Sequence, residues 1–217
     1  MRKIAIYGAG GFGRELACHI NRINRENPTW NIIGFFDDGI QKGTQISSYG
    51  MVFGGLEVLN NWDEPIDIAF AIGSPETMKK VFEQIRNTKI SYPNIIVPGI
   101  RFNDFETFRI GKGNIINSDC VFSCDVALGD FNILNGSVIL GHDVILGSYN
   151  VLMPSVRISG EVKIGNTNFF GVGSIVLQQI KIGNNVRLGA GSVLIRKPED
   201  GMLYVGNPAR IFNVNSV

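Results

Sequence analysis

The chain has little net charge and no long apolar run. Its 20 lysines and arginines nearly balance 19 aspartates and glutamates, for a net charge of +1, which gives no electrostatic basis for binding nucleic acid or an anionic membrane. No apolar run approaches the ~18 residues of a membrane-spanning helix, and the N-terminus lacks the apolar region and cleavage site of a signal peptide. We therefore expect a cytoplasmic protein with neither a membrane nor a nucleic-acid partner.

Histidine and cysteine are scarce, with two and three residues respectively. In a reducing compartment Cys18, Cys120 and Cys124 are expected to be free thiols. Cys120 and Cys124 have C-x3-C spacing, but a metal site needs more ligands than the sequence places near them, so we expect no metal. No Ser-His-Asp arrangement and no pair of catalytic carboxylates is found.

A six-residue period runs through the second half of the chain. Large apolar residues occupy every sixth position: Ile110, Ile116, Phe122, Leu128, Leu134, Leu140, Leu146, Leu152, Ile158, Ile164, Phe170, Val176, Ile182, Leu188 and Leu194. A short fixed period is typical of a solenoid, and a period of six is typical of a parallel β-helix with three hexads in each triangular coil. Side chains eighteen residues apart then stack, and the repeated apolar residues fill the interior.

Glycine often follows the apolar residue of a hexad, which we attribute to tight turns at the corners. These glycines are Gly111, Gly129, Gly141, Gly147, Gly165, Gly171, Gly183 and Gly189.

The first half of the chain alternates strand-like and helix-like segments. The expected elements are strands at 3–7, 31–36, 66–72 and 90–97, and helices at 14–25 and 75–86, with a loop-rich stretch at 39–62. Ser74 is expected to cap the second helix, with Pro75 in its first turn. This order predicts a small parallel sheet with helices on its faces.

The pattern changes at Pro98 and Gly99. We therefore predict two domains: an α/β, Rossmann-like N-terminal domain over residues 1–98, and a parallel β-helix with a C-terminal tail over residues 99–217. The N-terminal domain and the tail are expected to cap the two ends of the β-helix.

The hexads resemble those of the hexapeptide-repeat acyltransferases, in which the β-helix is left-handed. The segment VGNPARI at 205–211 resembles the G-x-P-A-[KR] sequence that follows the helix in that superfamily. YGAGGFG at 7–13, the Asp37-Asp38 pair and AIG at 71–73 resemble, more narrowly, the nucleotide-sugar N-acetyltransferase and sialic acid O-acetyltransferase family. The resemblance implies a left-handed β-helix that transfers an acetyl group from acetyl-CoA to a UDP- or GDP-linked amino sugar.

The motif Gly8-x-Gly10-x-x-Gly13 follows a predicted strand and precedes a helix, as in the dinucleotide-binding fingerprint. Glycines let the backbone approach a phosphate, and a helix N-terminus offers free N–H groups. On the residues alone, a nicotinamide cofactor and a tight turn without a ligand both stay open. Only about 95 residues precede the β-helix, however, which is half of a dinucleotide-binding fold.

The resemblance implies that this loop holds the nucleotide sugar. The implied contacts are Gly10, Gly11, Phe12, Asp37, Asp38 and Gly73. Some relatives carry histidine where this chain has Phe12, so a polar contact is missing and the sugar preference is expected to differ.

His142 is the candidate general base. It follows the apolar–glycine pair of a hexad, so its side chain is expected to project outward at a corner, whereas His19 is expected to be an ordinary helix residue. An imidazole titrates near neutral pH, which suits a group that takes up and releases a proton during acyl transfer to an amine. The adjacent Asp143 would orient the imidazole, although neighbours in sequence often point apart. The resemblance implies the same roles, and it implies that Asn135 positions the acceptor.

The resemblance also implies a groove for acetyl-CoA between neighbouring helices of a homotrimer, with contacts at Val151, Val172 and Ala190. Val172 and Ala190 are eighteen residues apart, hence one coil above the other, which suits a long thin molecule. Relatives often carry histidine at Val151, so that contact would be apolar or through the backbone.

The predicted activity is direct N-acetylation without an acyl-enzyme. O-acetylation of sialic acid or another glycan precursor stays open, because a histidine base serves an amine and a hydroxyl equally. An NAD-dependent oxidoreductase and a noncatalytic scaffold are the remaining alternatives.

Overall fold

The computed structural model of the protein describes residues 1–212, so residues 213–217 of the predicted second domain lie outside the described part. The chain divides into two compact units, Met1–Pro98 and a second that starts at Gly99. Within residues 1–212, no helix combines the length and the apolar composition that crossing a bilayer requires.

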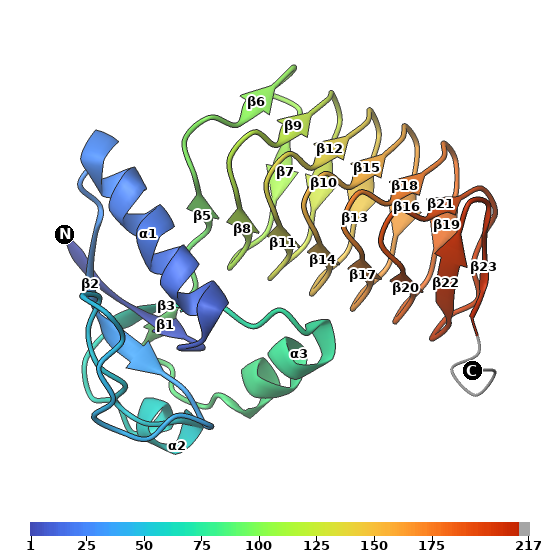
Figure 1. Ribbon diagram of the computed structural model, residues 1–217. Helices are drawn as coiled ribbons and strands as arrows, with labels where there is room; N and C mark the ends of the chain where they lie inside the picture. Colours follow the sequence, from blue (N-terminus) through green and yellow to red (C-terminus); the bar gives the residue numbers. More distant parts are fainter. Residues whose placement is uncertain (213–217) are drawn as a thin grey trace. The chain divides into compact units, whose positions relative to one another are not determined.

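The first unit contains a parallel sheet with the strand order β2-β1-β3-β4 (Figure 1). The helices and strands of this unit are β1 (Arg2–Tyr7), α1 (Gly11–Glu26), β2 (Trp30–Phe36), α2 (Leu56–Asn60), β3 (Ile66–Phe70), α3 (Pro75–Gln84), β4 (Ile90–Ser91) and β5 (Ile95–Ile96). The short helix α2 lies within the stretch at 39–62 that we predicted to be loop-rich. Ser74 caps α3 as predicted, with its Oγ accepting from the backbone N–H of Thr77 at 3.3 Å.

The single strand predicted over residues 90–97 is wrong. Two short strands, β4 and β5, occupy this segment, and Pro93 lies between them. Proline has no N–H to donate to a sheet, so it interrupts a strand that the hydrophobic pattern alone suggests.

The second unit is a parallel β-helix of stacked coils (Figure 1), and the predicted α/β domain followed by a β-helix is confirmed. One sheet contains β7 (Arg109–Ile110), β10 (Ala127–Leu128), β13 (Ile145–Leu146), β16 (Lys163–Ile164) and β19 (Lys181–Ile182). A second contains β6 (Arg101–Phe102), β9 (Val121–Phe122), β12 (Ile139–Leu140), β15 (Arg157–Ile158), β18 (Ile175–Val176) and β21 (Val193–Leu194). The third contains, within this unit, β8 (Ile115–Ile116), β11 (Ile133–Leu134), β14 (Val151–Leu152), β17 (Phe169–Phe170), β20 (Arg187–Leu188), β22 (Leu203–Gly206) and β23 (Ala209–Ile211).

The repeated apolar residues fill the interior of the β-helix. All of the hexad positions from Ile116 to Leu194 are at most 5% exposed, and only the first, Ile110, is partly exposed. The β-helix begins before Ile110, however, because β6 pairs in parallel with β9. Phe102 pairs with Phe122, twenty residues later instead of eighteen, and the two extra residues hide this first coil from the six-residue pattern.

A second interior series lies two residues before each apolar position. Its members are buried: Phe108, Asn114, Cys120, Val126, Asn132, Val138, Val144, Asn150, Val156, Val162, Asn168, Ser174, Ile180, Val186 and Ser192. Four of these residues form an asparagine ladder at one corner: Asn114, Asn132, Asn150 and Asn168. Each amide bonds to the next coil, which satisfies polar groups that would otherwise be costly to bury.

The glycines that follow the apolar positions do not make the corner turns, so that prediction is wrong. The residue with positive φ comes two positions later and is usually not glycine; Asp143, with φ of 58°, is an example. The glycines instead permit close approach of successive coils: a Cβ on Gly147 would lie 2.5 Å from the carbonyl oxygen of Gly165.

Candidate active site

His142 lies at an exposed corner of the β-helix, between β12 and β13, as predicted. Its Nδ1 lies 2.8 Å from Oδ2 of Asp143, and the two side chains are 54% and 57% exposed. The left-handed backbone of Asp143 allows two consecutive side chains to meet here. In the tautomer with the proton on Nδ1, the carboxylate accepts a hydrogen bond from Nδ1–H and the lone pair resides on Nε2, which is the arrangement that a general base requires.

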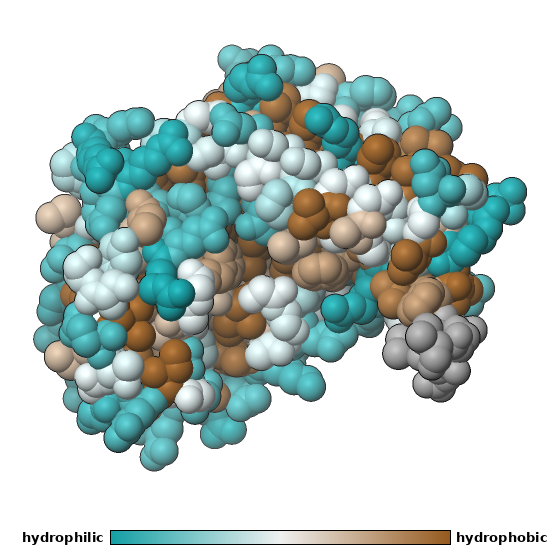
Figure 2. Space-filling view, viewed as in Figure 1, coloured by the Kyte–Doolittle hydropathy of each residue, from teal (hydrophilic) through white to brown (hydrophobic). Residues whose placement is uncertain are grey.

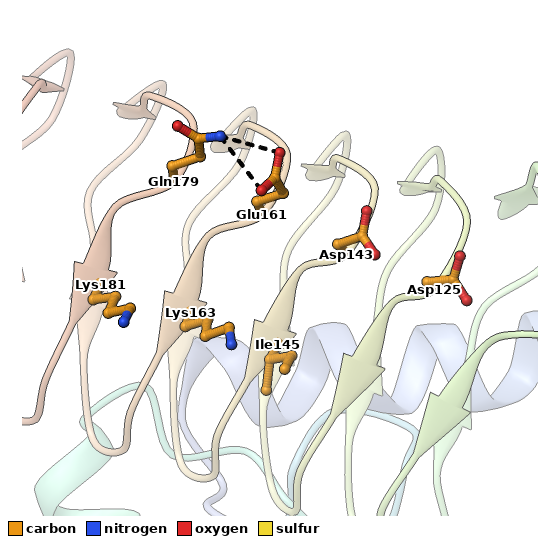
Figure 3. Close-up of a pocket in the computed structure, with 7 residues that line it drawn as sticks. All are labelled: Asp125, Asp143, Ile145, Glu161, Lys163, Gln179 and Lys181. Carbon is orange, nitrogen blue, oxygen red and sulfur yellow. Dashed lines mark hydrogen bonds between the residues drawn. The ribbon is translucent and has the colours of Figure 1, made fainter.

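A groove of about 600 Å³ is lined by Asp143, and His142 is not among the residues that line it (Figure 3). Two series of residues with eighteen-residue spacing line it. The corner series is Asp125, Asp143, Glu161 and Gln179, and the strand series is Ile145, Lys163 and Lys181. Gln179 donates to both carboxylate oxygens of Glu161, at 3.3 and 3.4 Å. The eighteen-residue spacing of the acidic corner residues is visible in the sequence, but the six-residue period of apolar residues does not draw attention to it.

Asn135 lies at the corner before β12, whereas His142 lies at the corner after it. The Asn135 side chain is half-buried and contacts neighbouring coils: its Nδ2 donates to the carbonyl oxygen of Leu152 at 3.1 Å, and its Oδ1 accepts from Asn117 at 3.3 Å. These bonds hold the amide in a fixed orientation on the β-helix.

The three residues assigned to acetyl-CoA differ in accessibility. Val172 is 48% exposed and Ala190 is also exposed, and the hydrogen bond from Gly191 N to Val172 O places them in adjacent coils as expected. Val151 as a whole residue is only 1% exposed. Neither its side chain nor its backbone therefore presents a surface to a ligand, in contrast to the contact that we expected.

The glycine loop joins β1 to α1, and its glycines have different environments. Gly8 has φ of +108°, and a Cβ there would lie 2.6 Å from the carbonyl oxygen of Ala71. A Cβ on Gly13 would lie 2.0 Å from the carbonyl oxygen of Gly8. These two glycines are required by the tight turn itself.

Gly10 and Gly11 have no such constraint. Gly10 is the N-cap of α1 without a side-chain cap, and no heavy atom lies within 4 Å of a Cβ built there. Gly10 and Gly11 are exposed, and Phe12 is half-buried beside them. Gly73, in the loop after β3, is exposed with equally open space. The open positions are those at which a ligand can approach the first N–H groups of α1.

Asp37 and Asp38 already accept hydrogen bonds from the protein. Asp37 Oδ2 accepts from Ala9 N at 2.8 Å, and its Oδ1 accepts from the N–H groups of Gly39 and Ile40. Asp38 accepts from Leu56 N at 2.8 Å and from the hydroxyl of Tyr7. The carboxylates therefore shape the glycine loop and the segment before α2, and only their remaining lone pairs are free for a ligand.

Tyr7 is buried, and this burial together with the hydrogen bond to Asp38 raises the pKa of its phenol. The phenol therefore remains a neutral donor to Asp38. Burial also raises the pKa of Cys120 to about 11, and its thiol donates to the carbonyl oxygen of Asn135. Such a protonated, buried thiol packs in the interior and is a poor nucleophile.

Basic residues line a second pocket, of about 430 Å³, formed by the last coil and the tail. Arg196, Lys197 and Arg210 contribute the cations, and Tyr204 and Ile211 contribute apolar surface. Exposed hydrophobic side chains are visible at this C-terminal end of the β-helix in the space-filling view (Figure 2). A pocket that combines cations with an aromatic side chain suits a phosphorylated nucleotide.

Comparison with known families matches both parts of the chain. Residues 3–85 match the family of the PglD N-terminal domain, and residues 161–196 match the bacterial transferase hexapeptide family of six repeats. A comparison with curated proteins finds no match.

Solved structures of similar overall fold extend over almost the whole chain. The acetyltransferase domain of PglB from Neisseria gonorrhoeae FA1090 is 28% identical, with a TM-score of 0.87 over 98% of this chain and 100% of that one. A structure of that domain in complex with acetyl coenzyme A has a TM-score of 0.86 at 28% identity, over 97% of this chain and 99% of that one. PerB from Caulobacter crescentus, in complex with CoA and GDP-perosamine, is 25% identical, with a TM-score of 0.80 over 98% of both chains.

Proposed function

We propose that this chain, a hexapeptide-repeat transferase of the sugar N-acetyltransferase family, moves an acetyl group from acetyl-CoA to the amine of a UDP- or GDP-linked amino sugar. It would do so as a cytoplasmic homotrimer. The His142–Asp143 pair carries the proposal: an exposed imidazole with one nitrogen on a carboxylate and the other available as a base.

The reaction would be a direct transfer. The neutral amine attacks the thioester carbon, and Nε2 of His142 takes the proton that the nitrogen loses. The tetrahedral intermediate collapses, the C–S bond breaks, and the proton passes from the imidazolium to the leaving thiolate. Asp143 stabilises the imidazolium through Nδ1. No acyl-enzyme is needed, and the buried, protonated Cys120 is poorly suited to form one.

The nucleotide sugar would lie against the glycine loop. Open space around Gly10 and Gly11 lets a diphosphate approach the N-terminus of α1. Phe12 follows β1 in the chain and Gly73 follows β3, so both would lie near the bound nucleotide sugar. The lone pairs of Asp37 and Asp38 that the protein leaves free would accept hydrogen bonds from the ribose or the base. Asn135 would contact the acceptor through the amide atoms that its hydrogen bonds leave available.

Acetyl-CoA would extend along the corner that carries His142. Arg196 occupies the same hexad position three coils later, which is about 14 Å along the column at ~4.8 Å between neighbouring strands. A pantetheine arm therefore spans the distance between the imidazole and the basic pocket. In a trimer, the corner with Val172 and Ala190 would form the opposite wall from a neighbouring copy. Val151, which is buried in the described structure, would contribute no surface to this wall.

The activity is tested by assaying acetyl-CoA-dependent modification of UDP- and GDP-linked 4-amino sugars beside free sialic acid. We expect CoA release and a mass gain of one acetyl group with an amino sugar. Turnover of sialic acid alone would establish O-acetylation instead. In a parallel thermal-shift experiment, stabilisation by NAD without stabilisation by acetyl-CoA would contradict the acetyltransferase proposal.

The basic pocket gives a second prediction, for the double variant that combines Arg196→Gln with Arg210→Gln. Losing charge-assisted hydrogen bonds to a phosphate is expected to raise KM for acetyl-CoA about 10-fold with little change in kcat. With 3′-dephospho-acetyl-CoA as donor, the variant and the wild type should differ much less. Arg25→Gln, at an exposed cation in the last turn of α1, is the control. An equal KM for acetyl-CoA in wild type and variant would remove the pocket from cofactor binding.

A further inference from the structure

We infer that Gly160 positions His142, and that the missing side chain at residue 160 keeps the imidazole on Asp143 with Nε2 facing the reacting amine. This inference rests on the proposed function, because it assigns a purpose to the orientation of the imidazole. Gly160 would act entirely through His142 and contribute no reacting group of its own.

The imidazole lies over Gly160, which follows His142 by eighteen residues and so stacks on it in the next coil. A Cβ on Gly160 would lie 2.4 Å from Nε2, 2.6 Å from Cε1 and 2.9 Å from Cδ2 of His142. All three distances are shorter than real Cβ contacts allow. The nearest of these atoms, Nε2, is the nitrogen that would take the proton.

The backbone does not require glycine at this position. Gly160 does not have a positive φ, so an L-residue fits its conformation. Residues at the same hexad position on the same corner carry side chains: Cys124, Gln178 and Arg196. The three atoms nearest to a Cβ on Gly160 all belong to the His142 ring. The absence of a side chain at residue 160 therefore leaves the space that the His142 ring occupies.

A methyl group at residue 160 would displace the ring and leave the coil intact. Glu161 N donates to His142 O at 2.8 Å, and this backbone bond links the two coils without using either side chain. The corner carboxylates of Asp143 and Glu161 point outward on adjacent coils (Figure 3). The exposed ring of His142 is free to rotate away, and rotation breaks the 2.8 Å contact between Nδ1 and Asp143.

The direct test is Gly160→Ala, assayed with an amino-sugar acceptor and acetyl-CoA. We expect kcat to fall on the order of 100-fold, which is the usual effect of misplacing a reacting group by about 1 Å. The melting temperature should not fall, because replacing an unstrained glycine by alanine reduces the entropy of the unfolded chain. KM for acetyl-CoA should change little. Wild-type kcat in Gly160→Ala would overturn the inference.

Ser148→Thr is the matched control. Ser148 occupies the same hexad position on the third corner of the β-helix, which carries neither His142 nor Val172, and threonine adds one methyl group while it keeps the hydroxyl that accepts from Asp130 N. The control should keep kcat within about two-fold of wild type, since this residue makes no proposed contact with either substrate. An equal loss in both variants would show that any added methyl group on the β-helix lowers activity, and would overturn the specific role of Gly160.

A double-variant cycle separates this inference from the proposed function. If Gly160 acts through the imidazole, Gly160→Ala should have no further effect in a His142→Ala background. A similar loss in both backgrounds would overturn the inference and leave the role of His142 intact. Full activity of His142→Ala would instead contradict the proposed base.

Nuclear magnetic resonance of the free protein tests the geometry without any substrate. The chain has two histidines, so ring resonances are assigned with a single variant, His19→Gln. Gly160→Ala should shift the ring Cε1–H and Nδ1 resonances of His142 and leave those of His19 unchanged. An unmoved His142 ring would overturn the inference even if the acetyltransferase activity were established.

Discussion

Replacing His142 by alanine is expected to lower kcat by about 100- to 10,000-fold, the usual contribution of a general base. The amine must lose a proton as it attacks, and no other imidazole lies on the β-helix. Binding of acetyl-CoA should persist, because the basic pocket lies three coils away on the same corner. The measurements are steady-state kinetics with the amino-sugar acceptor and the Kd for acetyl-CoA by isothermal titration calorimetry.

His19→Ala is the matched control for this prediction. His19 lies on α1, is 19% exposed and pairs with Glu15 at 3.5 Å one helical turn away. Its loss should leave kcat within about two-fold of wild type, since His19 makes no proposed contact with either substrate. Near-normal acetylation by His142→Ala would remove this residue from the mechanism, and a loss of acetyl-CoA binding in the same variant would show that its role is structural.

Much of the fold could be predicted because the β-helix repeats one physical requirement many times. Each hexad must bury one large apolar side chain, and the positions from Ile116 to Leu194 do so. The first coil was not predicted, because the twenty-residue step from Phe102 to Phe122 departs from the eighteen-residue spacing of the later coils. The second interior series was not predicted because it contains asparagine and serine as well as valine. A search for hydrophobic residues alone does not find such a mixed series.

The candidate site was only partly accessible to sequence reasoning. The exposed corner position of His142 followed from its place in the hexad, but its contact with Asp143 depends on a left-handed backbone that the sequence does not specify. Asp37 accepts hydrogen bonds from Ala9 and from the turn after β2, which requires knowing how β1 and β2 pair. The burial of Val151 likewise depends on packing around the β-helix.

The asparagine ladder provides the largest expected effect on stability, at Asn150→Ala. Asn150 Nδ2 donates to Asn132 Oδ1 and to Gly165 O, both at 3.0 Å. Its Oδ1 accepts from the backbone N–H and the side-chain amide of Asn168, at 3.0 and 2.9 Å. Alanine would leave the buried N–H of Asn168 and the carbonyl of Gly165 without these partners. Because each unsatisfied buried group costs about 1–3 kcal/mol, we expect the free energy of unfolding to fall by about 3–5 kcal/mol.

Ser174→Ala tests whether this loss comes from the ladder or from any change in the interior. Ser174 belongs to the same interior series and is 0% exposed, and its Oγ has no hydrogen-bond partner within the described residues. Removing a buried, unpartnered hydroxyl is expected to leave stability unchanged or to raise it slightly. Urea unfolding of both variants at one protein concentration makes the comparison valid even if subunits associate. Equal stability of the two variants would show that the ladder contributes no more than ordinary interior packing. A selective loss in Asn150→Ala would show that hydrogen bonds between coils, in addition to the apolar series, hold the column on which His142 is displayed.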